Sequence, residues 1–156
     1  MKAVAVNLNL DVSVIPEKVI DTFLMKEPTE EERAEYQKAL KAWAARPVEQ
    51  RGERPEYKKE YKTGAEFVVE TIGQAIRQAH PSGNVQSLRR TKKILGELNG
   101  ALKSEEKQGV ALLEPDDYKY IVSAFNKADK WVNSPENAEV VCAIAELLEQ
   151  KEEVEL

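Results

Sequence analysis

Apolar and polar residues alternate along the first part of the chain. Every second residue is apolar over eleven positions, namely Val4, Val6, Leu8, Leu10, Val12 and Val14. Successive side chains of a strand point to opposite faces, so this spacing predicts one long strand with a single apolar edge. Leaving all six side chains in water would forfeit about 9–18 kcal/mol of burial free energy. We therefore expect another segment or another chain to cover this edge.

The rest of the chain has the three- or four-residue apolar spacing that is typical of helices. Pro16 suits the first position of a helical segment, and Pro28 ends that segment. Thr29 and Glu32 have the spacing of a capping box, which predicts a second helix running to about Arg46. Four further helices are predicted at about residues 55–79, 85–103, 115–128 and 135–150.

Together these patterns predict a mainly α (α+β) fold with about six helices and one compact helical domain. We expect a strand segment at residues 1–15, the helical domain at 16–150 and a frayed acidic tail at 151–156. The short apolar run Val110–Leu113 is a candidate second strand. No internal repeat or low-complexity tract interrupts the chain.

Two arrangements could cover the N-terminal strand. It could lie on the helices and pair with residues 110–113, or it could pair with the same strand of another copy of the chain. The internal run has only four residues, whereas eleven extended residues span about 36 Å. We therefore favour the second arrangement, which predicts a homo-oligomer. Its predicted interface consists of Val4, Val6, Leu8, Leu10, Val12 and Val14.

Charge is unevenly distributed along a chain whose formal net charge is -5. Four basic residues lie close together in the fourth predicted helix, namely Arg89, Arg90, Lys92 and Lys93. Such a face could contact the phosphates of a nucleic acid or an acidic partner. We favour a solvated face that is balanced by the acidic C-terminal helix of the same or a neighbouring subunit. No zinc-finger spacing, aromatic ribonucleoprotein motif or basic zipper accompanies the cluster.

The residues that usually carry catalysis or metal binding are sparse. The single histidine, His80, lies beside Pro81 at a predicted helix end, and the single cysteine, Cys142, lies in an apolar run. A zinc shell would need more histidines or cysteines. Acids distant in sequence, such as Asp21 and Asp129, could meet in a cleft, but no motif predicts one. We expect no catalytic residue, no metal site and no cofactor.

Three aromatic residues are candidates for a protein interface: Trp43, Tyr120 and Trp131. We expect a cytoplasmic, non-enzymatic protein that binds other proteins, such as a small adaptor, assembly factor or regulator of the kind that phages and mobile elements carry. The alternative is a regulator that binds nucleic acid through residues 89–93. We expect no membrane association, because no run approaches the roughly 18 apolar residues that would span a bilayer.

Overall fold

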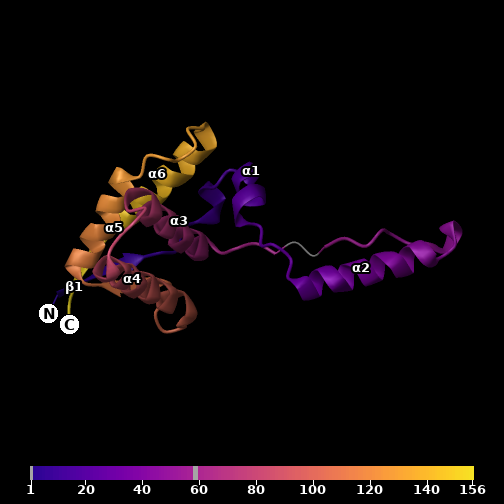
Figure 1. Cartoon of the computed structure of the whole chain (residues 1–156), viewed down its shortest axis with the longest axis horizontal. Coiled ribbons are helices and arrows are strands. Elements are labelled where there is room, and N and C mark those ends of the chain that lie inside the picture. The colour runs from indigo at the N-terminus through magenta and orange to yellow at the C-terminus, as the bar shows by residue number, and fades with distance from the viewer. Residues whose placement is uncertain (1, 58–59) are drawn as a thin grey trace.

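The structure is a computed structural model that describes residues 2–57 and 60–156, apart from the side chain of Val14. As predicted, the chain is mainly α with a small sheet (Figure 1). The helices are α1 (Glu17–Val19) continuing into the π-helical turn η2 (Ile20–Leu24), α2 (Glu30–Ala45), α3 (Gly64–Ala79), α4 (Val85–Lys103), α5 (Pro115–Lys127) and α6 (Pro135–Glu149). The strands are β1 (Lys2–Asn7), β2 (Val110–Leu113) and β3 (Glu152–Glu155). Short 3₁₀ turns cover Val12–Val14 (η1) and Val48–Gln50 (η3).

Strand β1 lies in the middle of the sheet, whose order is β2-β1-β3. Both neighbours are antiparallel to it, with Val4 opposite Leu113 and Ala3 opposite Val154. Strand β2 is the predicted run at residues 110–113. Strand β3 lies in the acidic tail, so the prediction of a frayed tail is wrong. Its glutamates suit the open edge of the sheet, because charged residues on an edge strand discourage pairing with further chains.

The predicted strand of residues 4–14 ends early, at Asn7. Beyond it the polar side chains bond to the local backbone: Asn7 Oδ1 accepts from the Asn9 amide at 3.0 Å, and Asp11 Oδ1 accepts from the Ser13 amide at 2.9 Å. Asn and Asp side chains characteristically form turns in this way and are depleted in strands. The polar positions that resembled the outer face of a strand are therefore turn residues.

The chain buries most of the apolar N-terminal edge in its own core. Val4, Val6, Leu8 and Leu10 are all buried, and Leu8 is completely inaccessible. Val12 is 43% exposed, and the side chain of Val14 lies outside the described part of the chain. The premise of the oligomer prediction, a strand without sufficient cover in its own chain, is therefore wrong. The core also contains Ile72, Ile76, Ile94, Leu98, Ile121 and Ile144.

Helix α3 begins at Gly64 rather than near residue 55, because residues 53–57 run back toward the body without forming a helix. Thr63 caps α3, because its hydroxyl accepts a hydrogen bond from the Glu66 amide at 3.1 Å. In return, the Glu66 carboxylate accepts a hydrogen bond from the Thr63 amide. Glycine is required at position 64, because a Cβ there would lie 2.0 Å from the carbonyl oxygen of Leu10. The segment after β1 and the start of α3 are thereby held in contact.

Candidate protein-binding arm

Helix α2 projects from the packed helices and sheet (Figure 1). We call residues 27–57 together with Glu60 the arm, and the remaining described residues the body. The arm consists of α2, the turn η3 at its far end and a segment that returns to the body. None of the residues of α2 is buried. The arm therefore presents almost the whole surface of a helix to solvent.

A short antiparallel ladder joins the arm to the body. The Lys26 amide donates to the Glu60 carbonyl at 2.8 Å, and the Lys62 amide donates to the Leu24 carbonyl at 2.7 Å. These bonds flank a bridge between Met25 and Tyr61. The Tyr61 hydroxyl donates to the Asp21 carboxylate at 3.1 Å, and this bond raises the pKa of Tyr61. Both chain segments are thus fixed where they leave the body.

The arm is held together by contacts between α2 and its return segment. The rings of Tyr36 and Tyr57 stack with their centroids 4.0 Å apart. Trp43 Nε1 donates to the Gly52 carbonyl at 3.0 Å, and the Arg51 guanidinium lies over the indole. Arg51 also donates to the carbonyls of residues 44 and 46, which satisfies acceptors at the end of the helix. Trp43, a predicted interface residue, thus packs inside the arm.

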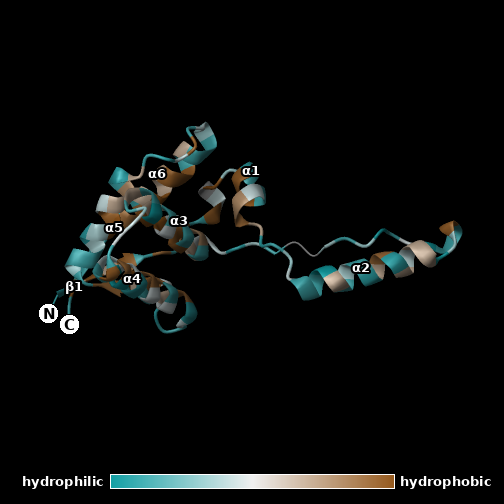
Figure 2. Cartoon of the chain, viewed as in Figure 1, coloured by the Kyte–Doolittle hydropathy of each residue, from teal (hydrophilic) through white to brown (hydrophobic). Residues whose placement is uncertain are grey.

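Local sequence explains why α2 forms without support from the body. It consists mostly of Ala, Glu, Lys, Leu, Gln and Arg, which are strong helix formers. Thr29 caps it by accepting from the Glu32 amide at 3.2 Å. Acidic residues fill its first turn, where they face the positive end of the helix dipole. Figure 2 shows hydrophilic colouring along most of the arm and hydrophobic colouring at its far end.

The predicted basic face of α4 is partly neutralised within the chain. Arg90 Nε lies 3.1 Å from Asp117 Oδ1, while Lys93 Nζ lies 2.9 Å from Glu114 and 3.2 Å from Asp117. Bonds to Glu114 and Asp117 raise the pKa of Lys93. The balancing acids come from the start of α5, not from the C-terminal helix. Of the four predicted residues, Arg89 and Lys92 are exposed and form no ion pair with a described residue.

The other two predicted interface aromatics also contact neighbours in the body. Tyr120 is half-buried and stacks on His80 with ring centroids 5.0 Å apart, and the Arg90 guanidinium lies 5.2 Å from its ring centre. Trp131 is half-buried and packs at a tilt against Phe125. The structure brings Tyr120 beside the basic face of α4, while Trp43 and Trp131 lie elsewhere. The three aromatics do not form one surface.

An open groove lies between α3 and α4 on the body. Its volume is about 1000 Å³, and its lining includes Leu10, Val69, Leu95 and the ion pair of Lys62 with Glu70. Neither Asp21 nor Asp129 lines this groove. Among the described residues, no group of three or more histidines, cysteines or acids is placed to hold a metal ion.

Comparison of the chain with protein-family models, with curated proteins and with solved structures finds no match. Over the described residues, every helix is too short or too polar to cross a lipid bilayer.

Sequence reasoning missed the arm. The apolar spacing predicts a helix here and places Tyr36, Leu40 and Trp43 on one face, but it does not indicate that this face packs on the return segment rather than on the body. Two signals could have shown otherwise. One is the low mean hydropathy of α2, and the other is the Thr63–Glu66 capping spacing, which marks a helix start at Gly64, about nine residues after the predicted one.

Proposed function

We propose that this chain is a non-enzymatic protein-interaction protein, of the adaptor, assembly-factor or regulator type, and that the arm is its binding surface. The observation that carries the proposal is a helix of 16 residues with no buried residue, projecting from a packed body. An isolated helix of about 12–15 residues is marginal in water, and most helices in proteins are stabilised by packing. A partner protein would supply the packing that the body does not.

The arm is suited to binding because it is already folded. The contacts of Tyr36 with Tyr57 and of Trp43 with Gly52 hold one side of α2 against the return segment. The opposite side presents Lys38 and Lys41 between exposed alanines. A partner that binds this outward side meets a preformed helix, and the entropy lost on association is smaller than for a disordered segment.

Nucleic-acid binding remains the alternative, and the geometry favours it less. Arg90 and Lys93 are paired with acids of the same chain, so two of the four predicted cations are already neutralised. Phosphate contacts supply most non-specific affinity for nucleic acid. Only Arg89 and Lys92 of this cluster present free charge to solvent among the described residues. We propose the cytoplasm as the location of this protein, because a single cysteine cannot form a disulfide within the chain.

The test compares two full-length variants with matched charge changes. Lys38→Glu/Lys41→Glu alters the outward side of the arm, and Arg89→Glu/Lys92→Glu alters the exposed cations of α4. Each variant is used as bait to capture binding proteins from cells that make the protein. A captured protein is then purified, and the dissociation constant of its complex with each variant is measured. We expect the arm variant to weaken binding at least about tenfold and the α4 variant to bind like the original chain.

Loss of binding in the α4 variant alone would contradict the assignment to the arm. A salt-dependent gel shift with duplex or single-stranded nucleic acid, lost in Arg89→Glu/Lys92→Glu, would favour the alternative function. Circular dichroism of both variants checks that they fold. Both pairs of residues are exposed, so charge reversal removes no buried contact.

A further inference from the structure

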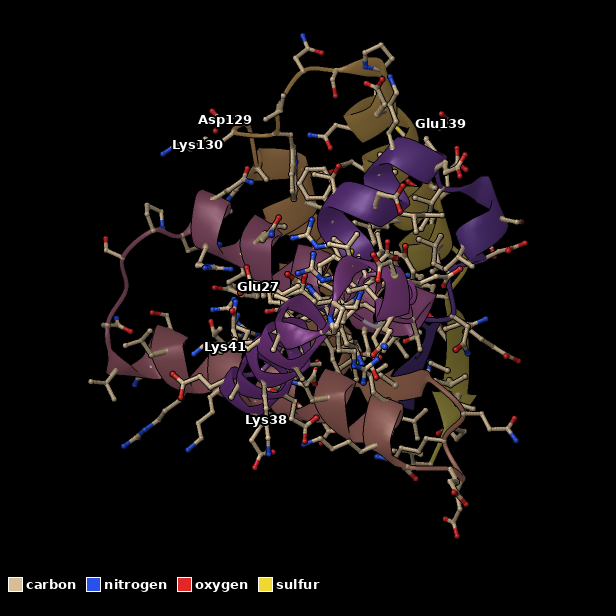
Figure 3. All side chains as sticks on the ribbon, turned by 90° about the vertical axis from the view of Figure 1, so that its right-hand side faces the viewer. Glu27, Lys38, Lys41, Asp129, Lys130 and Glu139 are labelled. Atoms are coloured by element: carbon tan, nitrogen blue, oxygen red, sulfur yellow. The ribbon has the colours of Figure 1, made fainter. Side chains whose placement is uncertain are left out.

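The far end of the arm carries more basic than acidic residues. We call residues 38–54 the arm tip. It contains five basic residues (Lys38, Lys41, Arg46, Arg51 and Arg54) against two acids, Glu49 and Glu53. Lys38, Lys41, Arg46 and Arg54 are exposed and form no ion pair with a described residue. Figure 3 looks along the arm and shows Lys38 and Lys41 on the same side of α2.

The arm tip also bears an exposed apolar side chain. Val48, in the turn η3, is 77% exposed, more than any other large apolar residue of the described chain. In the sequence it lies between Arg46 and Arg51 and beside Glu49. A partner that offers acids next to an apolar hollow would suit both the excess of basic residues at the tip and the exposed Val48.

The opposite charge gathers on helix α6 and strand β3 of the body. Residues 134–156 contain seven glutamates and one lysine. Glu139, Glu146 and Glu149 lie on the exposed side of α6, whereas Val140 and Ile144 lie in the core. Figure 3 shows Glu139 directed outward from this helix. We call this side of α6 the acidic face.

A small apolar hollow adjoins the acidic face. It has a volume of about 230 Å³ and lies between α1 with η2 and the start of α6. Phe23 and Val132 line it and are 50% and 70% exposed. Glu136 lines it from α6, and Lys18 lines it from α1. The acidic face thus combines negative charge with exposed apolar surface, which is the complement of the arm tip.

One chain cannot join its own two surfaces, because the arm extends away from the body while α6 packs within it (Figure 1). We propose that the arm tip of one copy binds the acidic face of a second copy, with Val48 directed to the hollow lined by Phe23 and Val132. The proposal rests on the proposed function and names the partner that the arm binds. It differs from the sequence-based oligomer, which used the N-terminal strand.

The contact joins two different surfaces, so it forms either a closed ring, of which a pair of copies with exchanged arms is the smallest, or an open chain of copies. In both arrangements the association depends on charge, and it weakens as salt screens the two surfaces. Sedimentation velocity over a concentration series distinguishes a dimer from longer assemblies. We expect self-association of the full chain in low salt, and its loss when salt is raised.

A charge exchange between two full-length variants tests the proposal. The first variant, Lys38→Glu/Lys41→Glu, makes the arm tip acidic. The second, Glu139→Lys/Glu146→Lys, makes the acidic face basic. Each variant alone is expected to lose self-association, with a dissociation constant raised at least about tenfold, because its arm and face then carry the same sign. An equal mixture is expected to associate, because each arm meets a face of opposite charge.

The control variant Arg89→Glu/Lys92→Glu should associate like the original chain. Restored association in the mixture also shows that both variants fold. A monomeric original chain at every concentration, or a mixture that stays monomeric, overturns the proposal. If self-association is absent while Lys38→Glu/Lys41→Glu still weakens binding of another protein, the second copy is the wrong partner and the proposed function stands. If no binding depends on the arm, both proposals fall.

Discussion

Replacing residues 27–59 by the dipeptide Asn-Gly should leave the body at least as stable as it is in the full chain. Lys26 and Glu60 face each other in the ladder at the base of the arm. Two residues of the Asn-Gly type connect antiparallel strands in a tight hairpin, so the shortened chain retains the ladder and the bond between Tyr61 and Asp21. No buried residue of α2 is lost, because it has none.

The expected magnitude follows from loop closure. Shortening a connection of about 33 residues to two lowers the entropic cost of closing it by about 2.5 kcal/mol, as an upper bound for a flexible loop. The free energy of unfolding should therefore stay unchanged or rise by up to about 2 kcal/mol. The denaturant dependence should change little, since it scales with the surface that unfolding exposes and the arm buries little.

Urea unfolding followed by circular dichroism measures both quantities. A control substitution in the core of the shortened chain, Leu98→Ala, should cost about 2–5 kcal/mol, because Leu98 is completely buried. The reasoning is refuted if removing residues 27–59 lowers the free energy of unfolding by more than about 1 kcal/mol. That result would mean that the arm packs on the body and is not free to bind a partner.

Three further predictions concern the body. Asp117→Asn should lower the free energy of unfolding by about 2 kcal/mol, because it removes the charge that binds Arg90 and Lys93. The control Asp116→Asn changes an exposed side chain and should alter this free energy by less than about 0.5 kcal/mol. Urea unfolding measures both effects. Gly64→Ala should destabilise the fold by at least about 1 kcal/mol, because the added Cβ meets a backbone carbonyl. Gly96→Ala should instead stabilise α4 by up to about 1 kcal/mol, because the space around Gly96 is open. Thermal unfolding of both variants and the original chain measures the two effects. Burial raises the pKa of Tyr118, so the folded chain keeps the phenol proton to higher pH than the unfolded chain does. The free energy of unfolding should therefore fall as the pH rises above about 10, and it should fall less steeply in Tyr118→Phe. Equal slopes of this free energy against pH in the two chains would contradict the prediction.

Local chemistry explains which parts of the fold could be predicted from the sequence. Pro115 and Pro135 occupy the first turns of α5 and α6, and Ser134 caps α6 by accepting from the Asn137 amide. These signals act over three or four residues, and the predicted helix starts agree with the structure. Strand β2 was also predicted, because its four residues form a continuous apolar run.

Two of the errors arose where distant parts of the chain decide the structure, and one arose from local hydrogen bonds that the alternating pattern does not show. Glu152–Glu155 has poor strand propensity, and it is a strand because β1 offers it an open edge. Asn7 and Asp11 fitted an alternating pattern, yet their side chains bond to local amides and end the strand. An apolar stripe on a helix does not specify what covers it, so the pattern of α2 could not distinguish the body from the return segment.

The central claim is that the arm binds a protein, and cross-linking from the arm tests it most directly. A photoreactive benzophenone amino acid is placed at Ala45, on the outward side of α2, or at Glu97, an exposed position of α4. The full-length chains are irradiated in the cells that make them, and the products are separated by mass. We predict a discrete protein product from position 45, at twice the mass of the chain if the partner is a second copy, and none from position 97. No product from position 45, or equal products from both positions, would contradict the claim.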